Sequence, residues 1–470
     1  MAHSRRDFLR NTACALGSMA LASTVESLGL VNAYAQSASD YRALVCIFLS
    51  GGNDCNNMIV DLNQYNSYSN VRNAAGLAIP QANLLQISPL SGGSYGLHPS
   101  LPEIKTLFDQ QKVAVVANVG PLVEPLTRTT YQNGTGKKPL QLFSHSDQVG
   151  LWQSSVADNV IQSGWGGRIA DKTGGLNGAA TFPQMTSIAG ISLFVTGQNT
   201  RPLAISDSNT PLASVLPLNN PPVSSGFTGA QNTARRTAFD QINALDPGIV
   251  LIKASAGVRS SALQTQAALA SVNPTINTLF PNTSIGRQLL QIARVIKAST
   301  DPIAGINMKR QIFFCNLGGF DTHSNQTSAT FGGGQGTLLL QLSQAMKAFY
   351  DATIELGVGP NVTTFTLSDF GRTLSPSGSG VAAVGSDHGW GNHHFVMGGS
   401  VIGGKLYGTY PTLALSGPDD TDNRGRWIPT TAVEQFAATL ANWYGLSSND
   451  FPAVFPLLNH FSPSNMGFMM

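Results

Sequence analysis

Three apolar segments of this 470-residue chain each end in a short polar run that contains an aspartate. The three runs are 50–54 (SGGND), 318–323 (GGFDTH) and 368–373 (SDFGRT). Ligands bind outside the carboxyl ends of the strands in open α/β sheets, and glycine there lets the backbone approach a ligand closely. Three strands that deliver Asp54, Asp321 and Asp369 to one edge would bring repelling carboxylates together. A bound divalent cation usually offsets such repulsion, and histidine often serves as a second type of ligand to it.

Histidines gather in similar short polar motifs. Seven of the eight histidines follow residue 35, and five of these seven lie in such motifs. The five are His145, His323, His388, His393 and His394. The last three belong to the run 386–394 (SDHGWGNHH), which also contains Asp387. This clustering favours a metal site over scattered structural histidines. The candidate metal ligands are Asp54, Asp321, His323, Asp369, Asp387, His388 and His394.

Each motif taken alone has a simpler interpretation. A single aspartate at a strand end is more often a helix cap or a turn former. Arg372 would either bind an anionic phosphate or sulfate, or pair with Asp369 and only hold the loop. The combination of motifs, and not any one of them, therefore favours the metal site.

The run 143–147 (FSHSD) offers a candidate nucleophile. Ser144 lies next to His145, so its hydroxyl is a candidate for activation by the imidazole. The alternative is that Ser144 caps a helix and His145 packs on it. The candidate catalytic residues are Ser144, His145 and Arg372.

The segments that precede these motifs have the composition of buried strands. They are rich in β-branched and aromatic residues and apolar on both faces, as in a parallel sheet covered on both sides. The expected strands are 43–49, 113–119, 311–317, 362–367 and 394–397. Helical patterns lie between them at about 101–108, 289–296 and 339–349, and near the C-terminus at 433–444. The alternation predicts a doubly wound α/β fold, with a mostly parallel sheet and helices on both faces.

The boundaries of these elements have their own sequence signals. Ser100 is the expected N-cap of the first helix, and Gly445 is the expected end of the last. Residues 206–232 are rich in Pro, Ser, Asn and Gly and predict a loop or an inserted cap, so we place an insertion at about 186–285. Cys46 and Cys315 lie in apolar runs and are expected to be buried thiols. Cys55 is either a thiol ligand or an incidental loop residue.

The first 35 residues have the features of an export signal. Residues 4–10 (SRRDFLR) match the twin-arginine pattern, and residues 33–35 (AYA) form a small-x-small cleavage site. Glu26 interrupts the weakly apolar stretch between them, which makes a poor permanent membrane span. No later segment has the uninterrupted apolar length of a span. The sequence therefore predicts transport by the twin-arginine translocase to a periplasmic or extracellular location, with no permanent span.

Length and charge narrow the classes of function. Cleavage would leave 470 − 35 = 435 residues (36–470), which exceeds a typical single core and predicts one large domain with insertions, or two lobes. The signal contains three arginines and two acidic residues, so the remaining net charge is (27 − 3) − (25 − 2) = +1. Such a small charge gives no indication of nucleic-acid binding.

At these motifs the chain resembles a family of exported bacterial proteins known as domain of unknown function 1501 (DUF1501). The landmarks are FLSGGND (48–54), GLHPSL (96–101), FSHSD (143–147), GWGGR (164–168), GGFDTH (318–323), SDFGRT (368–373), SDHGWGNHHFVMGG (386–399) and IPTTAVEQFAATLANWYG (428–445). The family in turn resembles the alkaline phosphatase and sulfatase superfamily in fold. The resemblance implies an alkaline-phosphatase-like domain with an inserted cap.

The resemblance also implies roles for the site residues. Asp54 would be the first-strand ligand, and Asp321 and His323 would serve one metal. Asp369 would bridge toward a second metal, and His388 or His394 would complete the set. Ser144 would be the nucleophile by position, although the nucleophile motifs usual in sulfatases and phosphatases are absent.

The expected function is that of an exported, metal-dependent hydrolase of phosphate or sulfate esters. It would use one or two divalent ions, whether zinc, calcium or magnesium, and act on a small or polymeric anionic ester. The alternative is a non-catalytic binding protein of the cell surface or periplasm that retains the same fold.

Overall fold

The computed structural model describes residues 40–180, 182–216, 227–245, 250–270, 275–300, 306–327, 332–380 and 383–470. Residues Arg42–Met470 form one compact unit. The predicted signal peptide, residues 1–35, lies outside the described residues. None of the helices in the described ranges combines the length and the apolar character that a membrane crossing requires.

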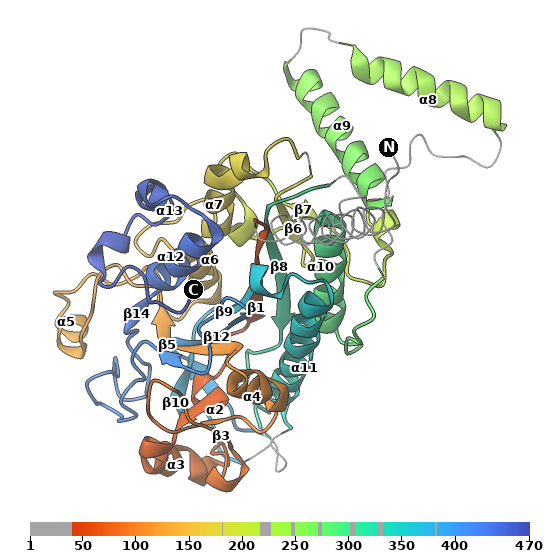
Figure 1. Ribbon diagram of the computed structural model, residues 1–470. Coiled ribbons are helices and arrows are strands. Elements are labelled where there is room, and N and C mark those ends of the chain that lie inside the picture. Colours follow the sequence, from red (N-terminus) through yellow and green to blue (C-terminus); the bar gives the residue numbers. More distant parts are fainter. Residues whose placement is uncertain are drawn as a thin grey trace, which may run out of the picture. The chain divides into compact units, whose positions relative to one another are not determined.

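A mixed, mostly parallel sheet forms the centre of this unit (Figure 1). Its strand order is β13–β5–β12–β9–β1–β8–β6–β7, and β14 also pairs with β5. β12 runs antiparallel to β5 and β9, and the other described pairs of this sheet are parallel. The strands are β1 (Arg42–Ser50), β5 (Val113–Gly120), β6 (Met185–Ser187), β7 (Leu203–Ala204), β8 (Arg310–Gly318), β9 (Val362–Ser368), β12 (Asn392–Gly398), β13 (Leu406–Tyr407) and β14 (Thr431–Ala432). Each of the five predicted strands lies within one of these, so the predicted α/β class is confirmed.

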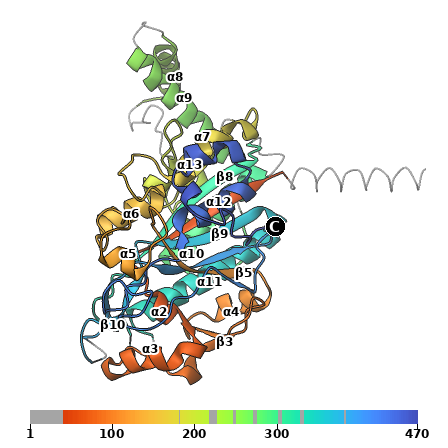
Figure 2. The same ribbon diagram turned by 90° about the vertical axis from the view of Figure 1, so that its left-hand side faces the viewer.

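Helices cover both faces of the sheet (Figures 1 and 2). On one face α11 (Gly334–Glu355) packs against both α4 (Pro102–Asp109) and α10 (Ser284–Thr300). On the other face lie α6 (His145–Ser154), α7 (Trp165–Thr173) and α12 (Val433–Tyr444). Alternate residues of β1, namely Leu44, Cys46 and Phe48, join the core under this second group, because successive side chains of a strand point to opposite faces.

Shorter elements surround the sheet. Two small antiparallel sheets consist of β2 (Ile59–Asp61), β4 (Tyr95–Leu97) and β3 (Leu85–Ile87), and of β10 (Arg372–Pro376) and β11 (Ser386–His388). The further helices are α2 (Cys55–Met58), α3 (Tyr65–Arg72), α5 (Arg128–Gln132), α8 (Gly229–Ala244), α9 (Val250–Ala270) and α13 (Phe451–Val454). The range 186–285 contains β7, α8 and α9, and the insertion placed there stays a prediction.

Two predicted helix boundaries can be compared with the structure. Gly445 ends α12 in the left-handed conformation with φ 111°, as expected of a glycine at this position. The N-cap predicted at Ser100 is wrong, because α4 begins at Pro102 and has Leu101 at its N-cap, without a side-chain hydrogen bond. The N–H groups of Glu103 and Ile104, which an N-cap side chain would bind, instead donate to Ser343 Oγ of α11, each at 3.2 Å.

The three cysteines of the described chain are buried free thiols. This confirms the prediction for Cys46 and Cys315. Cys55 lies in α2, where its thiol donates to the Gly391 carbonyl at 3.6 Å. It is therefore a buried residue at the start of a short helix, and its thiol is bonded to the main chain and not placed at the loop edge.

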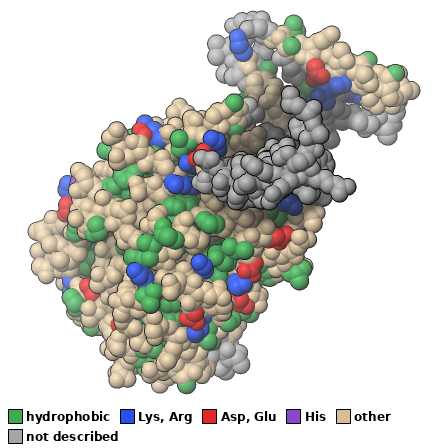
Figure 3. Space-filling view, in the orientation of Figure 1, with side chains coloured by type: hydrophobic (Ala, Val, Ile, Leu, Met, Phe, Trp, Pro, Cys, Tyr) green, Lys and Arg blue, Asp and Glu red, His purple; other side chains and the backbone are tan. Residues whose placement is uncertain are grey.

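Charged side chains are scattered over the face drawn in Figure 3, with apolar and uncharged polar surface between them. This agrees with a chain of which only 11% is Asp, Glu, Lys or Arg.

Glu434 in the first turn of α12 is a buried acid without hydrogen-bond partners. It has no exposed surface, and neither of its carboxylate oxygens is hydrogen-bonded in the structure. Burial raises its pKa to about 8, and the neighbouring charge of Arg168 offsets only part of this effect. The folded protein therefore favours the neutral acid.

We expect the folded protein to lose stability as the pH rises from about 4.5 through about 8, because the unfolded chain ionises Glu434 first. The difference between those two values corresponds to roughly 5 kcal/mol at full ionisation. Glu434→Gln should remove most of this pH dependence, and the half-buried Glu124→Gln should retain it. Chemical unfolding at pH 5, 7 and 9 measures the free energy of unfolding of each variant. The prediction is contradicted if this free energy changes with pH in the same way in the wild type and in Glu434→Gln.

Candidate metal centre

The loops that follow β1, β8 and β9 meet at one edge of the sheet. β1 pairs with both neighbours in parallel, so that Ser50 lies beside Gly318, and Leu49 beside Ser368. The three polar runs therefore leave the sheet side by side.

Gly51 brings the first two of these loops into direct contact. Its φ is 112°, which is unfavourable for other L-residues, and a Cβ there would lie 2.3 Å from the Asp321 nitrogen. Its N–H donates to Asp369 Oδ1 at 3.0 Å. Glycine at this position thus sets the spacing of all three loops.

We expect Gly51→Ala to destabilise the protein by about 1–3 kcal/mol more than Gly319→Ala, which is the range typical of overpacking. Gly319 has a similar φ of 103°, but a Cβ there meets its nearest neighbour, the Leu338 side chain, at 3.4 Å. Comparing the two variants therefore separates the cost of the steric collision at Gly51 from the cost of the backbone strain, which both variants share. Equal losses of unfolding free energy in urea would show that the loops are not in close contact at Gly51.

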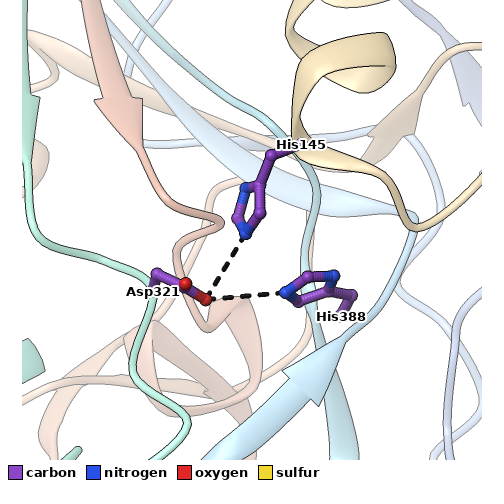
Figure 4. Close-up of side chains that lie close together, drawn as sticks. All are labelled: His145, Asp321 and His388. Carbon is purple, nitrogen blue, oxygen red and sulfur yellow. Dashed lines mark ion pairs between the residues drawn. The ribbon is translucent and has the colours of Figure 1, made fainter.

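Three side chains converge on one point at this edge (Figure 4). His145 is the first residue of α6, Asp321 follows β8, and His388 ends β11. The Nε2 atoms of His145 and His388 lie 3.4 Å and 3.5 Å from Asp321 Oδ1. One ligand atom from each residue lies within 4.8 Å of the others. The side chains are 34%, 49% and 23% exposed in that order, so the cluster lies at the surface, with His145 Nε2 itself turned inward and buried.

His323 lies directly beside this cluster. Its Nε2 is 3.2 Å from Asp321 Oδ1 and 3.0 Å from His388 Nε2. Its Nδ1 is 3.0 Å from Asp387 Oδ1. His323 therefore contacts two members of the cluster, and Asp387 holds its ring from behind.

Asp321 is held as an acceptor by Arg372. Burial raises the Asp321 pKa, but the hydrogen bond and positive charge of Arg372 outweigh burial and lower the pKa below its ordinary value. Arg372 Nη2 lies 2.5 Å from Asp321 Oδ1. The carboxylate is consequently ionised at neutral pH.

Arg372 holds the loops and is not placed to bind a substrate. Its side chain has no exposed surface. Its guanidinium donates to the carbonyls of Gly51, Gly52, Phe320 and Ser386. Of the two interpretations made from the sequence, loop support is the one that this geometry favours, although the partner is Asp321 and not Asp369.

Asp369 and Asp387 lie behind the histidines instead of joining the cluster. Asp369 Oδ2 is 2.6 Å from His145 Nδ1. Asp387 contacts His323 Nδ1 with one oxygen and Arg424 with the other, the latter at 2.7 Å. Both aspartates are predicted as ligands from the sequence. In the structure each instead contacts the Nδ1 atom of a histidine, on the side of the ring that faces away from the cluster.

Asp54 and His394 lie outside the cluster. The Asp54 carboxylate is fully buried and forms an ion pair with Arg72 at 2.5 Å, and Asn56 and Gln326 also donate to it. The ring of His394 packs 4.9 Å from that of Trp152 in the core. The structure therefore corrects the predicted ligand roles of both residues, because neither presents a free ligand atom at the loop edge.

Ser144 is the N-cap residue of α6. Its Oγ donates to Asp147 Oδ2 at 2.6 Å and lies 3.2 Å from Ser146 Oγ. Within the described chain, no hydrogen bond joins Ser144 to Asp321, His323 or His388. The geometry therefore gives the predicted nucleophile no partner in the cluster.

The sequence did not indicate two features of this site. The sequence predicts a catalytic role for His145 beside Ser144, whereas in the structure its Nε2 belongs to the cluster. The Phe143 carbonyl lies 2.7 Å from His388 Nδ1, and a main-chain contact of this kind has no side-chain signal. The clustering of five histidines in short motifs was the signal that could have placed His145 among the ligands.

The donor set fits a divalent transition metal. Four-coordinate zinc has bonds of about 2.0–2.2 Å to His and Asp, which places its ligand atoms about 3.3–3.5 Å apart. The contacts to Asp321 Oδ1 from His145 and His388 have that length. In addition, His145 Nε2 is buried and has no hydrogen-bond partner. Imidazole nitrogens suit zinc better than calcium or magnesium, which prefer oxygen ligands.

A cavity of about 660 Å³ lies at the other end of α6, near Val156, Arg168 and Leu457. None of the cluster residues lines it. The Arg168 guanidinium donates to the carbonyls of Ser154, Ser163 and Val454. The cavity is therefore separate from the metal centre, and its buried cation is already bonded to the main chain.

The family described as protein of unknown function, DUF1501, matches residues 305–450. The family resemblance drawn from the motifs is thereby confirmed for this segment, which includes Asp321, Asp369 and His388. No curated protein matches the sequence.

The fold is similar to several solved structures. One is the zinc complex of the periplasmic domain of EcEptC from Escherichia coli (10% identity, 87% of this chain and 84% of that chain, TM-score 0.35). Another is the PsFucS1 sulfatase from Pseudoalteromonas sp. (10% identity, 95% and 74%, TM-score 0.33). A third is the alkaline phosphatase PafA (10% identity, 71% and 63%, TM-score 0.29). Likeness at this level assigns no function, which must be argued from the site.

Proposed function

We propose that the protein is an exported, metal-dependent hydrolase of phosphate or sulfate esters. The observation that carries the proposal is the convergence of two imidazole nitrogens and one ionised carboxylate oxygen at a solvent-exposed loop edge. A structural metal site is usually closed by four protein ligands, whereas a catalytic one keeps a position open. Three ligand atoms within 4.8 Å of one another, all on partly exposed side chains, favour the open type.

The residues have separate tasks in this proposal. His145, Asp321 and His388 would hold a divalent metal. Such an ion would polarise the ester oxygen and lower the pKa of an attacking water. Because Ser144 is bonded to Asp147, we assign the attack to water and not to this serine.

Two partly exposed arginines lie beside the cluster. Arg426 donates from Nε to the His388 carbonyl at 2.9 Å, and Arg424 pairs with Asp387. Their side chains are 22% and 35% exposed. Because Arg426 also pairs with Asp422 at 2.6 Å, both cations already have a carboxylate partner, and they would bind an anionic ester only by exchanging these partners.

The test is hydrolysis of p-nitrophenyl phosphate and p-nitrophenyl sulfate by residues 36–470. We expect turnover of one of the two esters, its loss after treatment with a chelator, and its recovery with zinc. Activity that survives the chelator would exclude a metal-dependent hydrolase. Silence on both esters from protein that binds zinc would also remove the proposal.

The second candidate is a non-catalytic binding protein that keeps the metal for stability. It is favoured by one observation, namely that Ser144 is bonded to Asp147 and is not hydrogen-bonded to the cluster. This candidate predicts zinc binding and a lower melting temperature after chelation, with no hydrolysis of either ester.

The export part of the proposal depends on residues 4–10. Replacing both Arg5 and Arg6 by lysine should retain the protein in the cytoplasm, because the pair of arginines is the recognition element of the translocase. Cell fractionation of the full chain measures this. Undiminished export of the double variant would contradict the pathway.

A further inference from the structure

We propose that Asp369 is a positioning residue, which fixes the tautomer of His145 so that Nε2 presents its lone pair to the metal. This deepens the proposed function and depends on its metal centre. Asp369 would not itself be a ligand.

The contacts of Asp369 use both of its carboxylate oxygens. Oδ1 accepts from the Gly51 N–H at 3.0 Å, and Oδ2 lies 2.6 Å from His145 Nδ1. The side chain is 4% exposed. A carboxylate held in this way accepts a hydrogen bond from the ring, so the proton of neutral His145 resides on Nδ1.

The opposite nitrogen of His145 then faces the cluster as an acceptor. Nε2 is 3.4 Å from Asp321 Oδ1, it is buried, and it has no hydrogen-bond partner. Two acceptors that face each other across 3.4 Å repel, and a shared cation would convert the repulsion into binding. Metal-binding histidines commonly donate their second nitrogen to a carboxylate or a carbonyl in this manner.

The ring of His145 is also fixed by its neighbours. It lies 4.7 Å from the Phe370 ring and 4.4 Å from the His388 ring, measured between centroids. His388 shows the same arrangement, because its Nδ1 lies 2.7 Å from the Phe143 carbonyl. Both histidines of the cluster therefore have Nδ1 bonded behind them and Nε2 directed inward.

Asp369→Asn tests the inference with almost no change of shape. An amide has one acceptor oxygen and cannot accept from both Gly51 N–H and His145 Nδ1–H. If its NH2 group faces His145, Nδ1 becomes an acceptor, the ring proton moves to Nε2, and that atom can no longer bind a metal. We expect zinc affinity to fall about 10- to 100-fold, the range for such supporting partners.

The control is Asp147→Asn, which removes a charge from the same first turn of α6. It should bind zinc as the wild type does. Competition with a chromophoric chelator gives the affinities. Equal zinc affinity in Asp369→Asn and wild type would overturn the inference.

A second readout is independent of metal. In ¹⁵N-histidine-labelled, metal-free protein, two-bond ¹H–¹⁵N spectra distinguish the tautomers, and loss of signals in His145→Gln identifies His145. We expect Nδ1–H in the wild type and Nε2–H in Asp369→Asn. Nε2–H in the wild type would overturn the inference even if Asp369→Asn fails to fold. Failure of the wild type to bind zinc would instead remove the proposed function, and the tautomer would still decide the role of Asp369.

Discussion

Alanine in place of His145 or His388 is expected to lower the affinity for zinc by at least about 100-fold and to abolish ester hydrolysis. Loss of a partner behind a ligand typically costs 10–100-fold, so loss of a ligand atom should cost more. Each of these histidines supplies one of the three atoms that converge at the loop edge. Zinc titration and p-nitrophenyl ester assays measure the two effects.

The matched control is His460→Ala. His460 has its Nδ1 2.6 Å from the Val123 carbonyl and does not belong to the cluster. The His460→Ala variant should have the zinc affinity and the ester hydrolysis of the wild type. The assignment of the ligands would be wrong if His145→Ala and His460→Ala bound zinc equally well.

Replacing Asp54 by alanine should lower the free energy of unfolding by about 3–5 kcal/mol, because it leaves the buried Arg72 cation without its counterion. Both side chains of this pair are fully buried. Asp109→Ala provides the contrast, since the Lys105–Asp109 pair is exposed and should contribute less than about 1 kcal/mol. Urea unfolding measures both losses.

The same variant distinguishes a structural Asp54 from a ligand. Zinc affinity of folded Asp54→Ala should equal that of the wild type, because Asp54 bonds to Arg72, Asn56 and Gln326 and not to the cluster. A variant that keeps its stability and loses zinc would restore the ligand role predicted from the sequence.

The positions of the strands along the chain could be predicted because they depend on local composition. Runs such as 43–49 and 311–317 are apolar on both faces, and this is a property of each segment by itself. The convergence of Asp321 and Asp369 at one edge follows from the parallel pairing of β8 and β9 with β1. The sequence therefore indicated the region of the site.

The roles of the individual residues could not be predicted, because they depend on long-range partners. Nothing around Asp54 indicates that Arg72, at the end of α3, will occupy its carboxylate. Likewise, an aspartate that binds a metal and one that bonds to the far side of a histidine ring have the same local sequence, so the sequence predicts Asp369 as a ligand. Only the position of His145 Nδ1 separates the two roles.

The histidines are a second case in which the role of a residue depends on partners far away in the sequence. His388 lies at the end of a short strand beside the loop edge, whereas His394 lies within β12 against Trp152. The two belong to one motif in the sequence, but His394 pairs with Val116 in the central sheet, whereas His388 pairs with Arg372 in the small β10–β11 sheet. Burial lowers the pKa of His394 to about 3, so it remains a neutral core residue.

The most direct test of the metal centre is anomalous X-ray diffraction at the zinc edge from crystals of residues 36–470 grown with zinc. We predict a peak bonded to Nε2 of His145, Nε2 of His388 and Oδ1 of Asp321. A peak at Asp54 would contradict the account. So would a fully occupied zinc peak elsewhere in the protein with no peak among these three atoms.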